Sequence, residues 1–437
     1  MIESKYNLYY KIRNEIIVYN NRTKKMRFLC ADEYEALKES KLDNLSQMSS
    51  EQLRKEGFVI ALEGLEEEEL LKEFAQKIED NKLNLMILSS SSCNFACKYC
   101  YETKRPISID EQFAKTFLTF IRSSEKKYKS VFIEWFGGEP LLTSEMIIDI
   151  SQEVKNICKN NKTPFLSSIT TNGYYLTYKI FEKLVDANVV YYQITIDGDE
   201  KWHNYFRPLK DGGETYKTII ENLISIRDNV SKTKFFKITI RNNICKDNFE
   251  ACKKFEKTFD ALFHEDERFQ LFKFPISDWG GEEINKMRDS ILEDVDFDYT
   301  GINNYRNDLF ESIESACCLA AKKNAFVIDA EYQLFKCSHY VNPEQEVFLK
   351  NRVGQLNKDG TIDIDEVKNR HWYKKDVDIA CRGCQYLPNC LTQCPLSKLY
   401  PTESCKEKNK EELFRKIKQQ FQRQNQELLC TNIIDLN

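Results

Sequence analysis

The sequence has no apolar run long enough to cross a membrane, since a spanning helix needs about 20 consecutive apolar residues. It also has no long basic patch, because acidic and basic residues are mixed and the net charge is −5. Proteins that bind nucleic acid usually carry a basic surface, so this class is disfavoured. Residues 1–5 lack the apolar core of a signal peptide. We therefore expect a cytoplasmic protein that binds neither a membrane nor nucleic acid.

Cysteine, by contrast, is abundant. Of the 16 cysteines, three lie within residues 93–100 and eight lie between Cys317 and Cys405. In a reducing cytosol, clustered cysteines are more often metal ligands or catalytic groups than disulfides. The remaining five are scattered and are interpreted as small core or surface residues: Cys30, Cys158, Cys245, Cys252 and Cys430.

The first cysteine group follows an apolar run at residues 83–88 and has the spacing Cys93-x3-Cys97-x2-Cys100. Three thiolates on so short a loop can hold three irons of a cubic [4Fe–4S] cluster and leave the fourth iron open. Two other interpretations are a zinc site and unrelated buried thiols. Structural zinc sites usually combine paired Cys-x2-Cys units with a fourth ligand, which this loop alone does not supply.

Strand and helix patterns alternate from residue 83 onward, which predicts a parallel α/β sheet. Strands are expected at residues 83–89, 130–136, 165–170, 189–196, 235–241 and 269–274. Helices are expected at residues 110–123, 144–159, 176–185, 216–227 and 248–258. In parallel barrels the chemistry gathers at the C-terminal ends of the strands. The three-cysteine loop follows the first of these strands.

Residues 1–80 predict a small α+β module. We expect strands at 6–12, 15–19 and 26–29, and helices at 32–38, 50–56 and 65–78, with Ser50 capping the second helix. An exposed strand edge in such a module can bind an extended peptide by strand addition. The alternative is an extension that only packs against the rest of the chain.

Further motifs follow the predicted strands. The second strand ends in Gly137-Gly138-Glu139-Pro140, where glycines permit close backbone approach and a carboxylate can accept hydrogen bonds from an ammonium group. Asn172 follows the third strand, Thr195 lies in the fourth, and Arg207 comes soon after it. Ordinary turn chemistry would also explain Asn172 and Thr195.

The Cys-x3-Cys-x2-Cys loop and the Gly-Gly-Glu-Pro motif together resemble the radical S-adenosylmethionine (SAM) enzymes. The resemblance implies a partial (β/α)6 TIM-type barrel, in which the open iron chelates SAM and electron transfer splits SAM to a 5′-deoxyadenosyl radical. It further implies that the Gly137–Pro140 motif, Asn172, Thr195 and Arg207 line the SAM site and that Tyr99 lies near the adenine. Arg241 is a further candidate for this pocket.

The second cysteine group has the pattern Cys381-x2-Cys384-x5-Cys390-x3-Cys394, preceded by Cys318 and Cys337 and followed by Cys405. It resembles the SPASM domain, a C-terminal extension that carries two auxiliary [4Fe–4S] clusters, which would make three clusters in all. The resemblance implies one cluster on Cys381, Cys384, Cys390 and Cys405, and another on Cys318, Cys337 and Cys394. In the second cluster, either Cys317 would be the fourth ligand or the fourth iron would be open to substrate. The alternative is a rubredoxin-like zinc knuckle.

The SPASM resemblance is incomplete at two positions. Tyr332 replaces the glycine usual five residues before Cys337. Sulfatase-maturating members carry an aspartate base directly after that cysteine, whereas this sequence has Ser338 followed by His339. His339 is a candidate base in its place, or it is structural.

The resemblance as a whole implies a peptide maturase that installs a thioether or carbon–carbon crosslink in a ribosomally made precursor peptide. A flavodoxin- or ferredoxin-type protein would supply electrons. The expected domains are residues 1–80, the barrel at 81–310, the SPASM domain at 311–410 and a helical tail at 411–437. Alternatives are an anaerobic sulfatase-maturating enzyme, a small-molecule SPASM dehydrogenase and a non-catalytic zinc-binding scaffold.

Overall fold

The computed structural model describes the 437-residue chain with the exception of several segments. These are residues 13, 40, 63, 278–281, 293–317, 343–345, 374–376, 378–380, 392–394, 396–409, 412–413, 415–432 and 437. Most of the predicted helical tail at 411–437 therefore lies outside the described residues. No helix in the described part is both long and apolar enough to span a bilayer.

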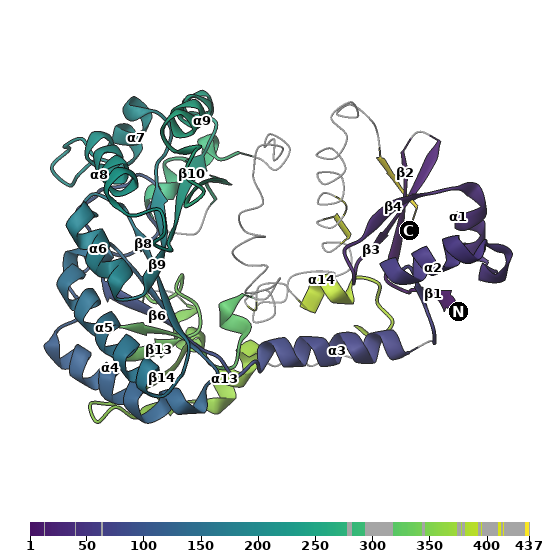
Figure 1. Cartoon of the computed structure of the whole chain (residues 1–437), viewed down its shortest axis with the longest axis horizontal. Coiled ribbons are helices and arrows are strands. Elements are labelled where there is room, and N and C mark those ends of the chain that lie inside the picture. The colour runs from purple at the N-terminus through teal and green to yellow at the C-terminus, as the bar shows by residue number, and fades with distance from the viewer. Residues whose placement is uncertain are drawn as a thin grey trace. The chain divides into compact units, whose positions relative to one another are not determined.

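The chain divides into two compact units (Figure 1). One, here called the terminal unit, combines Met1–Asp80, Ala316–Lys322 and His371–Asn437. The other, here called the sheet unit, comprises Asn81–Ser315 and Lys323–Arg370. Segments from both ends of the sequence thus contribute to one unit. The domain boundaries expected from the sequence stay a prediction about functional modules.

The sheet unit is built on a ten-stranded sheet of order β11-β10-β9-β8-β7-β6-β12-β13-β14-β15. Neighbouring strands are parallel from β11 to β12 and antiparallel from there to β15. The strands are β6 (Leu83–Ser90), β7 (Val131–Gly137), β8 (Phe165–Thr171), β9 (Val189–Thr195), β10 (Lys237–Ile244), β11 (Phe269–Pro275), β12 (Ala325–Asp329), β13 (Gln333–Phe335), β14 (Arg352–Leu356) and β15 (Ile362–Ile364). The mixed α/β class expected from the sequence is confirmed.

Helices connect the parallel strands. They are α4 (Glu111–Ser124), α5 (Ser144–Asn160), α6 (Tyr178–Asp186), α7 (Glu200–Phe206), α8 (Tyr216–Asn229), α9 (Phe249–Phe263), α10 (Glu282–Asn285) and α12 (Phe348–Asn351), while α13 (Glu366–Tyr373) continues into the terminal unit. Figure 1 shows α4, α5 and α6 lined up along one side of the sheet, and α5 and α6 contact β8 and β9.

The side chains of strand β7 show how the two faces of the sheet differ. Val131, Ile133 and Trp135 alternate along it and are buried, and the Trp135 indole donates a hydrogen bond of 3.1 Å to Ser151 of α5. Glu134 occupies the opposite face and is only partly buried. Among the described residues, none donates a hydrogen bond to its carboxylate, and burial raises its pKa to about 7. The face away from the helices therefore carries a desolvated carboxylate.

All eleven expected elements of this region are present, with ends shifted by a few residues. Several elements of the sheet unit were not expected from the sequence, among them α7 and the strand β12, which pairs in parallel with β6. The five residues of β12 are too few for periodicity to distinguish a strand from a helix.

The terminal unit contains a four-stranded sheet of order β16-β2-β3-β4 and a two-stranded pair of β1 and β5. Its elements are β1 (Ile2–Glu3), β2 (Asn7–Ile12), β3 (Glu15–Asn20), β4 (Met26–Leu29), α1 (Ala31–Lys38), α2 (Gln47–Glu56), β5 (Val59–Ile60), α3 (Leu65–Ile78), α14 (Leu387–Leu391) and β16 (Ile433–Asp435). The strands and helices expected within residues 1–80 are confirmed. The cap is a correction: α2 begins after Ser46, whose hydroxyl accepts from the Ser49 backbone, so Ser50 lies inside the helix.

Candidate functional site

The three-cysteine loop leaves the C-terminal end of β6 and is held by the segment that follows α7. The two segments run antiparallel, with a bridge between Phe95 and Leu209. The Ala96 amide donates to the Pro208 carbonyl at 2.9 Å, and the Lys98 amide donates to the Phe206 carbonyl at 3.0 Å. The backbone of the loop is therefore fixed by the residues on either side of Arg207.

The three thiols lie in a largely desolvated environment. Cys93 is buried, and Cys97 and Cys100 are partly buried. Burial raises the pKa of Cys97 to about 12, although the nearby Arg207 guanidinium opposes the shift. Within the described residues, no three His, Cys, Asp or Glu side chains are arranged to bind a single metal ion.

The Gly137–Pro140 motif is packed tightly against the start of the same loop. The Gly138 amide donates to the Ser90 carbonyl at 2.8 Å, and the Glu139 amide donates to the Ser92 carbonyl at 2.9 Å. A Cβ on Gly138 would lie 2.4 Å from the Ser92 oxygen. The close approach at this glycine is therefore between two segments of the chain, and Pro140 begins the short 3-10 turn that follows.

The Glu139 carboxylate joins the ends of β7 and β8. It is fully buried and accepts hydrogen bonds from the Thr171 hydroxyl at 2.6 Å, the Asn172 amide at 2.7 Å and the Leu141 amide at 2.9 Å. Burial raises its pKa, and these three donors oppose the shift. Asn172 in turn donates from its side chain to Asn94 at 2.7 Å, next to Cys93. Glu139 thus positions a residue that contacts the cysteine loop.

A buried polar network lies beside the cysteines. The Tyr99 hydroxyl donates to Asp197 and accepts from Arg207 at 2.9 Å and from Asn243 at 3.0 Å. Asp197 is fully buried, and burial raises its pKa while Arg207 opposes the shift. Tyr99 and Arg207 therefore meet beside Asp197, which follows the end of β9 at Thr195 by two residues. Asp197 and Asn243 were not among the predicted site residues, although both follow or end a strand as the others do.

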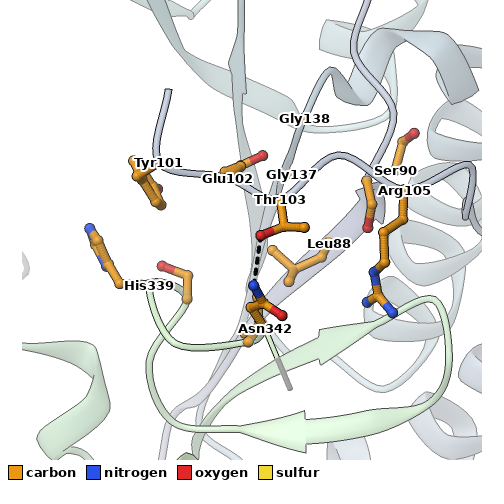
Figure 2. A pocket seen from close by; sticks show the side chains of 13 residues that line it. Leu88, Ser90, Tyr101, Glu102, Thr103, Arg105, Gly137, Gly138, His339 and Asn342 are labelled. Atoms are coloured by element: carbon orange, nitrogen blue, oxygen red, sulfur yellow. Dashed lines mark hydrogen bonds between the residues drawn. The ribbon is translucent and has the colours of Figure 1, made fainter. Parts of the chain in front are cut away.

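A small pocket of about 50 Å³ lies between the cysteine loop and the residues after β13. Its lining includes Tyr101, Glu102, Thr103, His339 and Asn342. Figure 2 shows the Tyr101 and His339 rings facing one another; they stack with centroids 5.0 Å apart, and Asn342 donates to Thr103 at 2.9 Å. The sequence did not single out Tyr101, Thr103 or Asn342. Tyr101 had one signal, its position directly after Cys100.

His339 lies on this pocket wall and close to a predicted cluster ligand. Its Nδ1 atom is 3.8 Å from the Cys337 sulfur. Burial lowers the pKa of its imidazole, and the positive charge of Arg241 lowers it further. His339 is therefore neutral near pH 7 and able to accept a proton. Its role as a base stays a prediction.

Two residues of the second cysteine group belong to a turn that packs on the N-terminal segment of the terminal unit. Gly383, between Cys381 and Cys384, has φ of +77° and donates its amide to Glu67 at 2.9 Å. Cys390 lies in α14, and Cys318 is exposed. Cys317, Cys394 and Cys405 lie outside the described residues. Both auxiliary ligand sets therefore stay predictions.

Comparisons with known proteins agree with this geometry. Residues 87–250 match the family described as "Radical SAM superfamily". The chain carries a radical SAM domain. This domain implies SAM and a [4Fe–4S] cluster as cofactors.

Its radical SAM relatives include maturases. The chain is 23% identical over 340 residues, 71% of its own length and 87% of the relative's, to a cysteine-type anaerobic sulfatase-maturating enzyme of Clostridium novyi (strain NT). It is 26% identical over 257 residues, 53% of its length and 52% of the relative's, to the radical SAM cyclopropyl synthase TigE of Paramaledivibacter caminithermalis. The structure of native anSMEcpe with bound AdoMet and Kp18Cys peptide superposes with a TM-score of 0.56 at 17% identity, covering 79% of this chain and 99% of that one. The last similarity concerns the fold.

The residues present fit a cluster with SAM bound to it. Arg207 Nε and Asn94 Nδ2 are both buried, and neither has a hydrogen-bond partner among the described residues. Buried donors are rarely left without a partner, so these two indicate an acceptor that the protein itself does not supply. A carboxylate such as that of SAM provides such oxygens, and a guanidinium is the side chain best suited to bind it.

Proposed function

We propose that this radical SAM enzyme crosslinks a ribosomally made peptide through a thioether or carbon–carbon bond. The observation that carries this proposal is the position of the three cysteines beside the network of Tyr99, Asp197 and Arg207. Two buried donors there, Arg207 Nε and Asn94 Nδ2, have no partner among the described residues. Similarity to maturases supports a peptide as the substrate. The partial (β/α)6 barrel and the SPASM domain belong to the same proposal.

Each group in the site has a role in this proposal. Cys93, Cys97 and Cys100 would hold the cluster, and Arg207 with Asn94 would orient the SAM carboxylate. When bound, the cluster and SAM supply one-electron cleavage of a carbon–sulfur bond, which creates a radical able to activate a substrate C–H bond. Tyr99 and Asp197 fix the Arg207 side chain, and the buried loop excludes water from the reacting atoms.

The peptide would dock on the terminal unit. Strand β4 pairs with β3 on one side, and among the described strands none pairs with its other edge. The β4 residue Phe28 is 42% exposed, which is high for a large apolar side chain. An extended peptide can add to such an edge through main-chain hydrogen bonds. The auxiliary clusters would take up the electron released by oxidative crosslinking.

The first test is anaerobic reconstitution with iron and sulfide, followed by SAM and dithionite, with 5′-deoxyadenosine measured by mass spectrometry. We expect steady product from the unmodified chain and none from Cys97→Ala. The control is Cys30→Ala, which removes an exposed thiol that belongs to neither cysteine group and should retain product. Zinc in place of iron, with no SAM cleavage, would refute the proposal.

Sulfatase maturation is the second candidate, because one relative that covers 71% of the chain has that activity. Ser338 at the expected position of the aspartate base counts against it. Incubation with a cysteine-containing sulfatase peptide, followed by hydrazine labelling of aldehydes, separates the two. We expect no labelled product; formylglycine formation would establish sulfatase maturation instead.

A further inference from the structure

Tyr6 carries a buried hydroxyl with no hydrogen-bond partner. The residue precedes β2 and is 0% exposed, and its hydroxyl has no partner among the described residues. An unsatisfied buried polar group destabilises the folded chain. Such groups are uncommon in native structures, and each one suggests a ligand, ion or water that completes it.

The surroundings of Tyr6 point to the second cysteine group. Tyr6 shares a core with Phe74 of α3 and Leu387 of α14, and Cys381 and Cys384 pack against the same core. Burial chiefly raises the pKa of the Tyr6 phenol, the charges of Glu67 and Glu66 raise it further, and the Cys384 thiol in the same core adds to them. The hydroxyl is thus a spare donor beside a predicted cluster ligand.

The cysteine turn is itself fixed by the residues next to Tyr6. The Glu67 carboxylate accepts from both the Lys5 ammonium and the Gly383 amide, so residue 5 and the turn share one acceptor. The Cys384 amide donates to the Cys381 carbonyl at 3.1 Å, which closes the turn. The Asn21 side chain also donates to the Gln385 carbonyl at 2.9 Å. The position of Cys384 relative to Tyr6 is therefore set by three independent contacts.

We propose that the Tyr6 hydroxyl donates a hydrogen bond to the Cys384 sulfur when this sulfur is bound to iron, and thereby raises the reduction potential of that auxiliary cluster. Hydrogen bonds to cluster sulfurs stabilise the more negative, reduced state. Partners of this kind, one shell beyond the metal, commonly tune a site. The inference rests on the auxiliary cluster of the proposed function.

The test uses Tyr6→Phe, which removes the hydroxyl and keeps the ring that packs on α3 and α14. The matched control is Tyr9→Phe. Tyr9 is 1% exposed but belongs to a different core, and its hydroxyl donates to Glu3 at 2.6 Å. Both variants are reconstituted as the full chain, and each cluster is titrated potentiometrically by electron paramagnetic resonance. We expect a lower potential for one auxiliary cluster in Tyr6→Phe and unchanged potentials in Tyr9→Phe.

A second measurement covers the case in which Tyr6→Phe folds poorly. In the unmodified chain, electron–nuclear double resonance of the reduced auxiliary cluster should show a coupled proton that exchanges in D2O. Selective labelling of tyrosine should assign this proton to a phenol. If the coupling instead comes from water, which could also bridge Tyr6 to the unpaired Glu66 oxygen, the inference is wrong. Unchanged potentials in an iron-replete Tyr6→Phe chain would overturn it equally.

These outcomes are separable from failure of the proposed function. Zinc at Cys381 and Cys384 would overturn the inference, while SAM cleavage at the Cys93 loop could persist. Conversely, a chain that does not modify peptides could still show the shift in potential. The cluster at the Cys93 loop serves as an internal reference in each sample.

Discussion

The Tyr99 hydroxyl contacts three polar side chains at once, which gives a test at the scale of one atom. In Tyr99→Phe, Arg207 and Asn243 lose an acceptor and the buried Asp197 loses a donor. Each unsatisfied buried group costs about 1–3 kcal/mol. We therefore expect a fall of at least that size in the free energy of unfolding, measured with urea. Tyr175→Phe, at a side chain that is 37% exposed, should change it little; equal effects would contradict the network.

Glu134 predicts a pH effect on stability. Burial raises its pKa from 4.5 to about 7 in the folded chain. The folded chain therefore binds this proton more tightly than the unfolded chain, so rising pH removes stability between about pH 4.5 and 7. The loss is at most about 3.5 kcal/mol, because each pKa unit corresponds to about 1.4 kcal/mol. The Glu134→Gln variant lacks this titrating group. The free energies of unfolding of the variant and the unmodified chain, measured with urea, should therefore differ more at pH 7.5 than at pH 4.5. A constant difference would contradict it.

The site residues show what a sequence can reveal at this scale. The spacing of Cys93, Cys97 and Cys100 and the position of Arg207 after a strand predict one site, and the structure places the segment around Arg207 beside the cysteine loop. The partners of Glu139 and Tyr99 were not predictable, because they come from other strands and depend on register. Nothing local in the sequence distinguishes Asp197 in its strand-end turn from an ordinary turn residue.

At the scale of elements, the junction of β6 and β7 depends on a glycine. In Gly138→Ala the new Cβ would meet the Ser92 carbonyl oxygen at 2.4 Å, and backbone cannot rotate away. Overpacking of this kind costs about 1–3 kcal/mol. Because Ser92 adjoins Cys93, we expect less iron at this loop after reconstitution. Gly212→Ala has nothing within 4 Å of its Cβ, so its φ of +85° costs only local backbone strain, and this variant should retain its iron. Equal iron in both variants would show that the junction tolerates a side chain.

The positions of helices and strands were easier to predict from the sequence than the pairing of the strands. Long amphipathic helices such as α3 were found to the residue, because fourteen positions carry one apolar face. The pairing of β12 with β6 joins residues more than 200 positions apart and leaves no local signal. Tyr332 illustrates a third case. It holds φ of +66°, a backbone conformation that favours glycine, at the position where the SPASM resemblance implies a glycine.

The whole chain offers a test through metal loading. The cysteine turn at 381–384 shares hydrophobic cores with β2, α3 and α14 in the terminal unit. Because metal binding couples to folding, a metal bound at this turn should stabilise the elements that pack against it. Cys384→Ala should therefore speed amide hydrogen exchange in α3 and β2 after reconstitution. Cys97→Ala should leave these two elements protected. The opposite pattern would show that the turn contributes nothing to the order of this unit.

The pairing of β16 with β2 has a consequence for how the protein is made. Ile433–Asp435 lie beside residues 10–12, so this edge of the first sheet can be completed only after more than 400 residues have been translated. Until then a newly synthesised chain exposes an open strand edge next to unmetallated cysteines. We therefore expect the terminal unit to take up iron and sulfide only after this edge has been completed, and a chaperone that covers β2 would protect the chain meanwhile.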